Sequence, residues 1–283
     1  MNKAASYSPN SLNELINFSK NLSEFTVIAG GTDIMPKLNR CELSPAAFLD
    51  ITRIDELKKI NETDEFIKIG AGVTLSRIPQ NDSIREYSPA LHYASSLIGS
   101  VQIRNRATLI GNVANMSPAA DSIPPLLIYN TGFEIILNGE LSLLSLNDLI
   151  AKQKNKSLKN FIIVSMILKK EQQGFKSFFL RQGTRNGMGL AVASLAFGVE
   201  TDDLNKINDV RIAAGAVAPT PFRCTETESF MYGKQFSKEL FEKAAGILLK
   251  EIKPIDDIRA SASFRKDCIK NMFLHFYTQT TVH

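Results

Sequence analysis

Residues 104–121 have the sequence RNRATLIGNVANMSPAAD, and the interpretation of the whole chain starts from this stretch. Small and hydrogen-bonding residues fill it, in a run that neither a helix nor a strand can use. Gly111 permits close approach of the backbone, and Pro118 interrupts a helix. The Asn and Ser side chains bond to neighbouring backbone or to a ligand. The stretch is therefore either an elaborate surface turn or a loop that holds a polar group.

A second glycine loop, AGGTD at residues 29–33, follows the apolar run FTVI at residues 25–28. A β-branched run that ends in paired glycines predicts a strand followed by a tight turn, whose N–H groups can converge on an anion such as a pyrophosphate. No Gly-Lys-Ser/Thr follows the loop, and the G-x-G-x-x-G spacing is absent. The loop is therefore neither a Walker loop nor a Rossmann fingerprint.

Four blocks of the sequence together resemble one family, the FAD-binding (medium) subunit of the molybdenum hydroxylases, which include xanthine dehydrogenase and carbon monoxide dehydrogenase. The order and spacing of the blocks match that family over nearly the whole chain. Where the family often has Thr-Ile-Gly-Gly-Asn, this chain has Thr-Leu-Ile-Gly-Asn at residues 108–112. The blocks are AGGTDIMPKL (29–38), IGSVQIRNRATLIGNVANMSPAADSIPPLL (98–127), FLRQGTRNGM (179–188) and GAVAPTPFR (215–223).

The resemblance implies an α+β fold. A two-subdomain FAD-binding fold of the vanillyl-alcohol-oxidase (PCMH) type would be followed by a C-terminal α/β sandwich domain. We place the boundary at the polar link 169–174, where the composition changes to alternating strand and helix signals. The predicted domains are then residues 1–172, with subdomains of about 1–55 and 56–172, and residues 173–283.

The resemblance implies that this chain is the electron-transfer subunit of a larger complex. A molybdopterin-binding large subunit would oxidise the substrate, and a small subunit with 2Fe-2S clusters would pass on the electrons. FAD on this chain would collect them and deliver them to NAD or another acceptor. No side chain of this chain need be a catalytic acid or base, and the sequence shows no Ser-His-Asp, Cys-His or paired-carboxylate arrangement.

Matching the motifs residue by residue gives the candidate contacts to FAD. Backbone N–H groups of residues 29–32 and of Gly111 and Asn112 would bind the pyrophosphate. Thr32 and Asn115 would add side-chain hydrogen bonds. The full set is Val27, Ile28, Ala29, Gly30, Gly31, Thr32, Asp33, Ile34, Ile98, Thr108, Gly111, Asn112, Asn115, Asp121, Val164 and Arg181.

Four of these positions have alternatives or depart from the family. Asp121 would accept a hydrogen bond from a hydroxyl of FAD, but it could equally cap the helix that begins near Pro124. Ile98 and Val164 match the family's apolar contacts to the flavin ring, and both also suit ordinary core packing. Arg181 stands near the pyrimidine edge of the flavin where the family more often has Lys, while Arg185 matches the family.

The composition indicates a soluble protein with no nucleic-acid partner and no bound metal. The 283 residues carry a net charge of +4 without a basic stripe. Three separated Cys and three His show no metal-ligand spacing. The N-terminus lacks an apolar signal region, and no run is long enough to insert in a membrane. We therefore expect a cytoplasmic protein.

Periodicity and turn signals predict the main elements. Ser11 would cap a helix over residues 12–18, and the basic segment 151–160 would be an exposed loop. Further helices are expected in 87–99, from 124, from 146 to 150 and in 240–249, and strands in 25–28, 133–139, 161–168, 175–181, 191–200 and 210–217.

Two alternatives to the electron-transfer subunit remain. A vanillyl-alcohol-oxidase-type flavoenzyme would oxidise its own substrate, and it typically has a covalent flavin and a large substrate-cap domain, neither of which is apparent. A non-catalytic scaffold would have lost FAD, and it would not need the two glycine loops.

Overall fold

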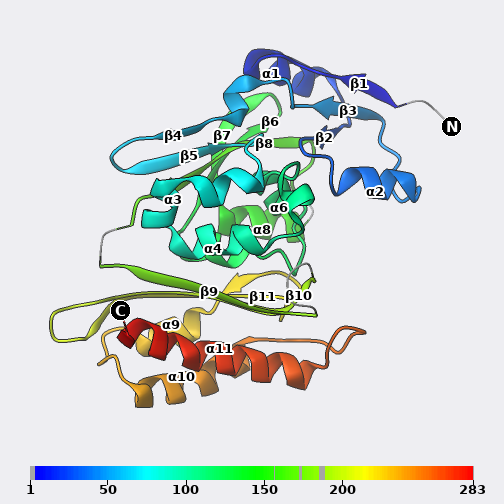
Figure 1. The fold of residues 1–283 in the computed structure, drawn as a ribbon. Coiled ribbons are helices and arrows are strands. Elements are labelled where there is room, and N and C mark those ends of the chain that lie inside the picture. The colour runs from blue at the N-terminus through cyan, green and yellow to red at the C-terminus, as the bar shows by residue number, and fades with distance from the viewer. Residues whose placement is uncertain (1–3, 156, 172–173, 185–188, 283) are drawn as a thin grey trace. The chain divides into compact units, whose positions relative to one another are not determined.

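The computed structural model describes residues 4–155, 157–171, 174–184 and 189–282. The chain forms two compact units, each a mixture of helices and sheets (Figure 1). The first comprises residues 1–80, 100–115 and 130–169, and the second comprises residues 81–99, 116–129 and 170–283. The predicted α+β class is confirmed. The stretch at 104–121 contributes to both units, because the chain passes from the first to the second after Asn115.

A three-stranded parallel sheet opens the first unit. Its strands are β1 (Ala5–Tyr7), β2 (Thr26–Ile28) and β3 (Ala47–Asp50), in the order β1-β3-β2. Helix α1 (Leu12–Asn21) connects β1 to β2, and the Ser11 hydroxyl accepts a hydrogen bond from the Glu14 N–H at 3.2 Å. The predicted capped helix is confirmed. Helix α2 (Ile34–Asn39) was not predicted; its Pro36 lies in the first turn, where an N–H needs no partner within the helix.

A five-stranded antiparallel sheet completes the first unit, in the order β4-β5-β8-β6-β7. Its central strand β8 (Phe161–Lys169) is almost entirely buried, as its apolar run predicted. Asn138 and Gly139, with φ of 51° and 75°, form the two-residue turn between β6 and β7. The other strands are β4 (Ile60–Glu62), β5 (Phe66–Gly70), β6 (Gly132–Leu137) and β7 (Glu140–Ser145).

Short helices cover the first unit. They are η1 (Asp55–Lys58), η2 (Leu75–Gln80), α5 (Val101–Arg104), α6 (Leu109–Ala114) and α8 (Leu146–Lys154). The expectation of a loop over residues 151–160 was wrong for its first four residues, which belong to α8. Ser145 caps this helix, and Lys152 and Lys154 lie in its last turn, where positive charge is favourable.

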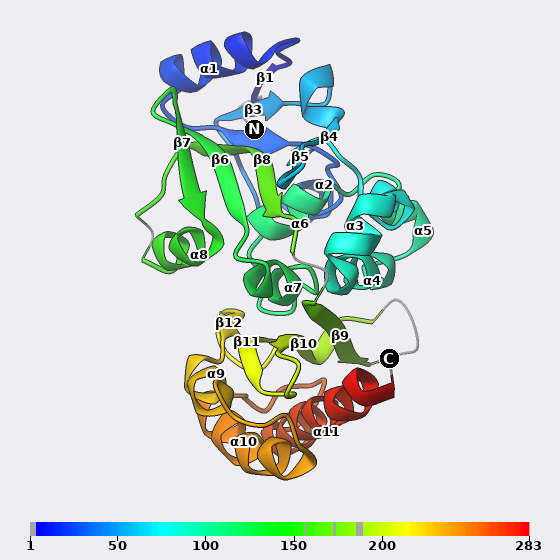
Figure 2. The ribbon, with the colours of Figure 1, turned by 90° about the vertical axis from the view of Figure 1, so that its left-hand side faces the viewer.

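A four-stranded antiparallel sheet forms the centre of the second unit, in the order β12-β11-β10-β9. The strands are β9 (Lys176–Gly183), β10 (Ala191–Thr201), β11 (Ile207–Gly215) and β12 (Phe222–Arg223). Figure 2 shows α7 (Ile123–Ile128) on one side of β10 and β11. On the other side lie α9 (Thr225–Met231), α10 (Lys238–Glu251) and α11 (Ala262–Val282). Helices α3 (Asp82–Tyr87) and α4 (Pro89–Leu97) also belong to this unit, and α4 packs on β9.

The core of the second unit between the sheet and helices α9 to α11 is rich in phenylalanine. Phe197 of β10 stacks on Phe276 of α11 with ring centroids 5.3 Å apart, and Phe241 of α10 stacks on Phe273 at 4.9 Å. Such aromatic contacts contribute stability beyond the area that they bury. Helix α10 was predicted from residues 240–249. Among the described residues, no helix combines the length and apolarity needed to cross a membrane.

Candidate functional site

The first glycine loop joins β2 to α2 in the first unit. Gly31 has a φ of 73°, a left-handed conformation that glycine adopts without strain. The backbone N–H groups of residues 30–33 have no hydrogen-bond acceptor among the described residues. Successive unpaired N–H groups in a turn of this kind form an anion-binding concavity. The loop therefore presents donors that suit a negatively charged group.

Gly30 has a different role from Gly31, because it lies against the protein's own backbone. A Cβ atom at this position would be 2.0 Å from the carbonyl oxygen of Arg106 and 2.9 Å from the Cα of Ala107. The segment beyond Ala107 is held in turn by Val73 and Leu75, since the Leu75 N–H donates to the Ala107 carbonyl at 2.8 Å. The two glycine-containing stretches thus pack directly on each other within the first unit.

The expectation of a loop over residues 104–121 was wrong for residues 109–114, which form helix α6 with Thr108 as its N-cap. The Thr108 hydroxyl accepts a hydrogen bond from the Gly111 N–H at 3.0 Å. The Thr108 carbonyl accepts one from the Asn112 N–H, also at 3.0 Å. A Cβ atom at Gly111 would lie 2.8 Å from the Thr108 hydroxyl oxygen. The two N–H groups that were expected to bind a pyrophosphate are therefore engaged within the helix in this structure.

Asp33, Lys37 and Asn115 connect the two stretches through their side chains. The Lys37 ammonium group lies 2.6 Å from Asp33 Oδ2 and donates to Asn115 Oδ1 at 3.2 Å. Asn115 Nδ2 donates to Asp33 Oδ1 at 3.3 Å. These partly exposed contacts add little stability, but they link α2 to the end of α6. Lys37 was not among the predicted residues; its position four residues after Asp33 in a helix is the signal that could have found it.

The second unit contains the rest of the long stretch, residues 116–122, as an ordered loop. The Ser117 hydroxyl accepts from the Ala119 N–H at 3.3 Å, and the Ala216 N–H donates to the Pro118 carbonyl at 2.8 Å. A Cβ atom at Gly215 would lie 2.9 Å from Pro124 Cγ. The GAVAPTPFR block therefore packs on this loop and on α7, which explains why its glycine stands where it does.

Asp121 and Arg181 form a buried ion pair in the second unit. The side chains are 6% and 9% exposed, and Arg181 Nη1 donates to Asp121 Oδ2. Arg181 Nη2 donates to the Gly189 carbonyl at 3.0 Å. Arg181 was expected beside a flavin ring, and in this structure its guanidinium is engaged by these partners. Residue Arg185 lies outside the described residues.

One carboxylate oxygen of Asp121 takes no part in the ion pair with Arg181. Asp121 Oδ1 is buried and has no hydrogen-bond partner among the described residues. Burial raises the pKa of this carboxyl, and the charge of Arg181 opposes the rise. The N-cap of α7 is Ser122, so the alternative role of Asp121 as that cap is not what the structure shows. A buried acceptor without a partner is costly, and a hydroxyl donor would satisfy it.

The aliphatic candidates lie at separate places in the two units. Ile98 is the half-buried C-cap residue of α4 in the second unit. Val164 lies in β8 of the first unit, where its side chain is 2% exposed and its carbonyl accepts from the Ala71 N–H at 2.9 Å. Val27 and Ile28 are partly buried in β2, and Ile34 begins α2.

Family profiles match both parts of the chain. The profile of the FAD binding domain in molybdopterin dehydrogenase matches residues 2–168. The profile of the CO dehydrogenase flavoprotein C-terminal domain matches residues 178–280.

Two curated relatives match over nearly their whole length. The glyceraldehyde dehydrogenase medium chain of Sulfolobus acidocaldarius is 30% identical over 263 residues, which cover 92% of each chain. The xanthine dehydrogenase FAD-binding subunit of Escherichia coli O157:H7 is 27% identical over 264 residues, which cover 92% of this chain and 90% of the relative.

Among solved structures, a chain of the carbon monoxide dehydrogenase from Hydrogenophaga pseudoflava superposes with a TM-score of 0.88. The superposition covers 96% of this chain and 95% of that chain at 23% identity. At this identity the comparison establishes the fold.

Proposed function

The chain belongs to the family of FAD-binding subunits of the molybdopterin dehydrogenases, and we propose that it transfers electrons within a complex of several subunits. As in the family, it is an oxidoreductase subunit whose cofactor is FAD. A small subunit with 2Fe-2S clusters would deliver the electrons, and a large molybdopterin subunit would oxidise the substrate. The acceptor would be NAD or another oxidant, and the complex would work in the cytoplasm.

The residues present fit FAD. The unpaired N–H groups of residues 30–33 in the first unit suit a pyrophosphate, and this observation carries the proposal. In the second unit, the partnerless Oδ1 of Asp121 suits a hydroxyl donor of the kind that the ribityl chain or the ribose provides. Both features are complementary to groups that FAD has, and neither has a hydrogen-bond partner in the part of the chain that the structure describes.

We assign the binding roles residue by residue. In the first unit, backbone N–H groups of Gly30 to Asp33 would bind the phosphates, and the Lys37 ammonium would add a positive charge beside them. Thr32 and Asn115 would donate or accept side-chain hydrogen bonds. The N–H groups of Gly111 and Asn112 take no part in this proposed binding, because both donate hydrogen bonds to Thr108.

In the second unit, Asp121 would accept a hydrogen bond through Oδ1 while Arg181 holds its other oxygen. The ion pair fixes the carboxylate in place, and the charge of Arg181 opposes the rise in its pKa that burial causes. Ile98 is proposed to present aliphatic surface to the isoalloxazine ring, whereas the side chain of Val164 is buried in β8 and suits core packing. When bound, FAD supplies reversible one- and two-electron chemistry, which these side chains do not have.

The acceptor can be tested on the full-length chain with its FAD bound. Under anaerobic conditions, NADH is added while the visible flavin bands are recorded. Bleaching of the bands by NADH, and not by NADPH or buffer alone, supports NAD as the acceptor. Bands that persist with NADH but bleach with dithionite would show a flavin that works with a different acceptor.

A further inference from the structure

Tyr129 follows α7 and connects three elements of the second unit through its phenol group. Its side chain is 1% exposed. The hydroxyl accepts a hydrogen bond from the Ala90 N–H of α4 at 3.1 Å and lies 2.5 Å from the Ser177 hydroxyl of β9. Its ring meets the edge of Phe175 with centroids 6.5 Å apart. One hydroxyl thus joins the end of α7, the beginning of α4 and the sheet.

The phenol takes the place of an ordinary helix cap at α4. The residue before the helix is Ser88, a type that normally caps a helix through its hydroxyl. Here the Ser88 side chain makes no capping bond, and its buried hydroxyl has no partner among the described residues. The first N–H groups of a helix need an acceptor when they are buried, and Tyr129 supplies one for Ala90.

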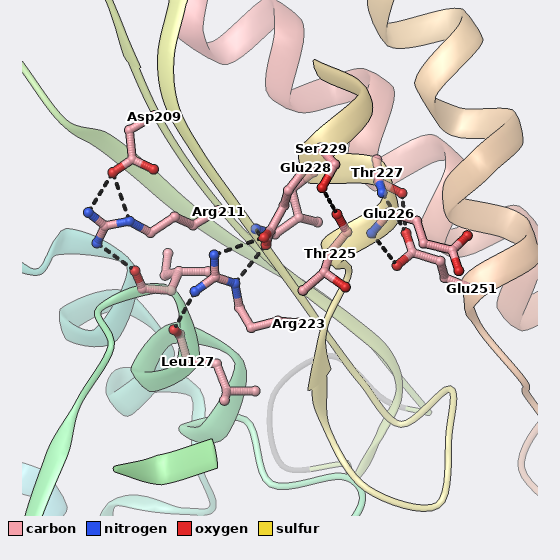
Figure 3. Close-up of polar contacts among 12 residues, drawn as sticks. Leu127, Asp209, Arg211, Arg223, Thr225, Glu226, Thr227, Glu228, Ser229 and Glu251 are labelled. Carbon is pink, nitrogen blue, oxygen red and sulfur yellow. Dashed lines mark hydrogen bonds and ion pairs between the residues drawn. The ribbon is translucent and has the colours of Figure 1, made fainter. Parts of the chain in front are cut away.

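Two arginines hold the last carbonyls of α7 next to Tyr129. Arg223 Nη1 donates to the Leu127 carbonyl at 3.2 Å, and Arg211 Nη1 donates to the Ile128 carbonyl at 2.9 Å. Figure 3 shows Arg223 between Leu127 and Glu228. The Glu228 carboxylate accepts a hydrogen bond from Arg223 Nε at 2.6 Å. The C-terminal end of α7 is therefore fixed to the sheet, and the backbone of Tyr129 follows directly from this fixed end.

Both helices that meet at Tyr129 carry a candidate flavin contact at their far ends. Asp121 lies two residues before the first residue of α7, and Ile98 is the C-cap residue of α4. A displacement of α4 relative to α7 would change the distance between these two side chains. Because α4 is one continuous helix from Pro89 to Leu97, a shift at its beginning would be passed on to Ile98 at its end.

We propose that Tyr129 is a positioning residue for FAD: its phenol hydroxyl fixes α4 against α7 and so sets the placement of Ile98 relative to Asp121. This inference rests on the proposed function, since both residues are assigned to FAD there. The role belongs to the hydroxyl rather than to the ring. A substitution that removes only this oxygen atom can therefore test the role.

The test is Tyr129→Phe in the full-length chain, with two measurements. Amide hydrogen exchange of residues 90–98 should become roughly two- to tenfold faster, which corresponds to the loss of one hydrogen bond. The Kd for FAD, titrated into the apoprotein, should rise by a similar factor, and the visible circular dichroism of the bound flavin should change. A change in that spectrum reports the surroundings of the flavin ring, which a loss of stability alone would not move.

Thr227→Val is the matched control. Thr227 is fully buried in the same unit, and its hydroxyl donates to Glu251, so the variant loses a buried hydroxyl of comparable environment. It should leave the FAD Kd, the flavin spectrum and the amide exchange of residues 90–98 as in the wild type. Ser177→Ala, which keeps the bond from Ala90 to the phenol, should have a smaller effect than Tyr129→Phe.

The outcomes separate this inference from the proposed function. If the wild type binds FAD and Tyr129→Phe binds it with unchanged Kd and unchanged flavin spectrum, the positioning role is wrong and the proposed function stands. An equal effect from Thr227→Val would also overturn the role, because the cause would be stability alone. A wild-type chain that binds no FAD would overturn the proposed function and this role together.

Discussion

Gly30 lies so close to Arg106 that a Cβ atom at residue 30 would be 2.0 Å from the Arg106 carbonyl oxygen. Residues 76 positions apart are thus held backbone to backbone, and the first glycine loop rests on the beginning of the stretch 104–121. The neighbouring Gly31 faces a different constraint, because its φ is 73° and a Cβ there would meet only side-chain atoms at 3.4 Å or more. Gly30 is therefore required for close backbone packing, and Gly31 is required for its left-handed backbone conformation.

Substitution of Gly30 should destabilise the protein. In Gly30→Ala the new methyl group overlaps the backbone of Arg106, which cannot move aside as a flexible side chain would. We expect the free energy of unfolding to fall by about 1–3 kcal/mol, as for overpacked sites. Gly246→Ala is the control: Gly246 lies in α10 with no atom within 4 Å of the place that a methyl group would take, so the variant should gain roughly 0.5–1 kcal/mol. Denaturant titration of both variants measures the difference, and equal stability of Gly30→Ala and wild type would refute the close packing.

Substitution of Gly31 should remove FAD while the fold is retained. A β-branched residue is strained at a φ of 73°, so Gly31→Val should rearrange the loop and disperse its unpaired N–H groups. Bound flavin is measured after purification, and far-UV circular dichroism should stay near that of the wild type. Gly233→Val matches this change, because Gly233 also has a φ of 73° and lies outside the loop. It should keep its FAD, and stoichiometric flavin in Gly31→Val would exclude the role given to the loop.

Much of the fold follows from local sequence signals. The capping of α1 by Ser11, the buried strand β8 and the amphipathic helix α10 were all predicted, because each has a pattern within a few residues. Helix α11 was not predicted, although Ile269, Met272, Phe273 and Phe276 have helical spacing. The domain boundary at residue 172 stays a prediction.

The site was less accessible to sequence reasoning, because its glycines and charges serve long-range contacts. Gly111 looks like part of a phosphate-binding loop, whereas the structure shows that Thr108 caps α6 by accepting a hydrogen bond from the Gly111 N–H. Arg181 was matched to a flavin contact, and its partner 60 residues away, Asp121, cannot be deduced from spacing. Motif resemblance singled out these residues as a group, but only the fold shows which of them bond to each other.

Loss of the Asp121 carboxylate should affect both stability and binding. Asp121→Asn leaves the Arg181 guanidinium buried without its counter-charge, so the free energy of unfolding should fall by about 3–5 kcal/mol. The FAD Kd should rise as well, because an amide holds its acceptor oxygen less firmly. Glu239→Gln, which breaks the exposed pair with Lys243, is the control and should change neither quantity. A variant with wild-type stability would show that the ion pair is not formed in solution.

Acid should weaken the protein partly through Asp257. The hydrogen bonds from Arg259 hold the pKa of this carboxyl well below its usual value, and the Arg265 guanidinium lies 2.8 Å from it. A lowered folded-state pKa means that the stabilisation is complete above the unfolded pKa of about 3.9 and is lost as the pH falls from there through the folded pKa. Asp257→Asn should therefore show a shallower loss of stability between about pH 5 and pH 2. Identical acid profiles for variant and wild type would contradict this assignment.

The amount of FAD held by the purified full-length chain tests the central claim most directly. The visible absorption spectrum is recorded before and after denaturation, and the flavin released is identified and compared with the protein concentration; if the chain is isolated as apoprotein, FAD is titrated into it. We predict flavin bands, release of unmodified FAD on denaturation, and saturation at one FAD per chain. A chain that neither contains nor takes up FAD would contradict the account, and its two glycine loops would then serve the fold alone.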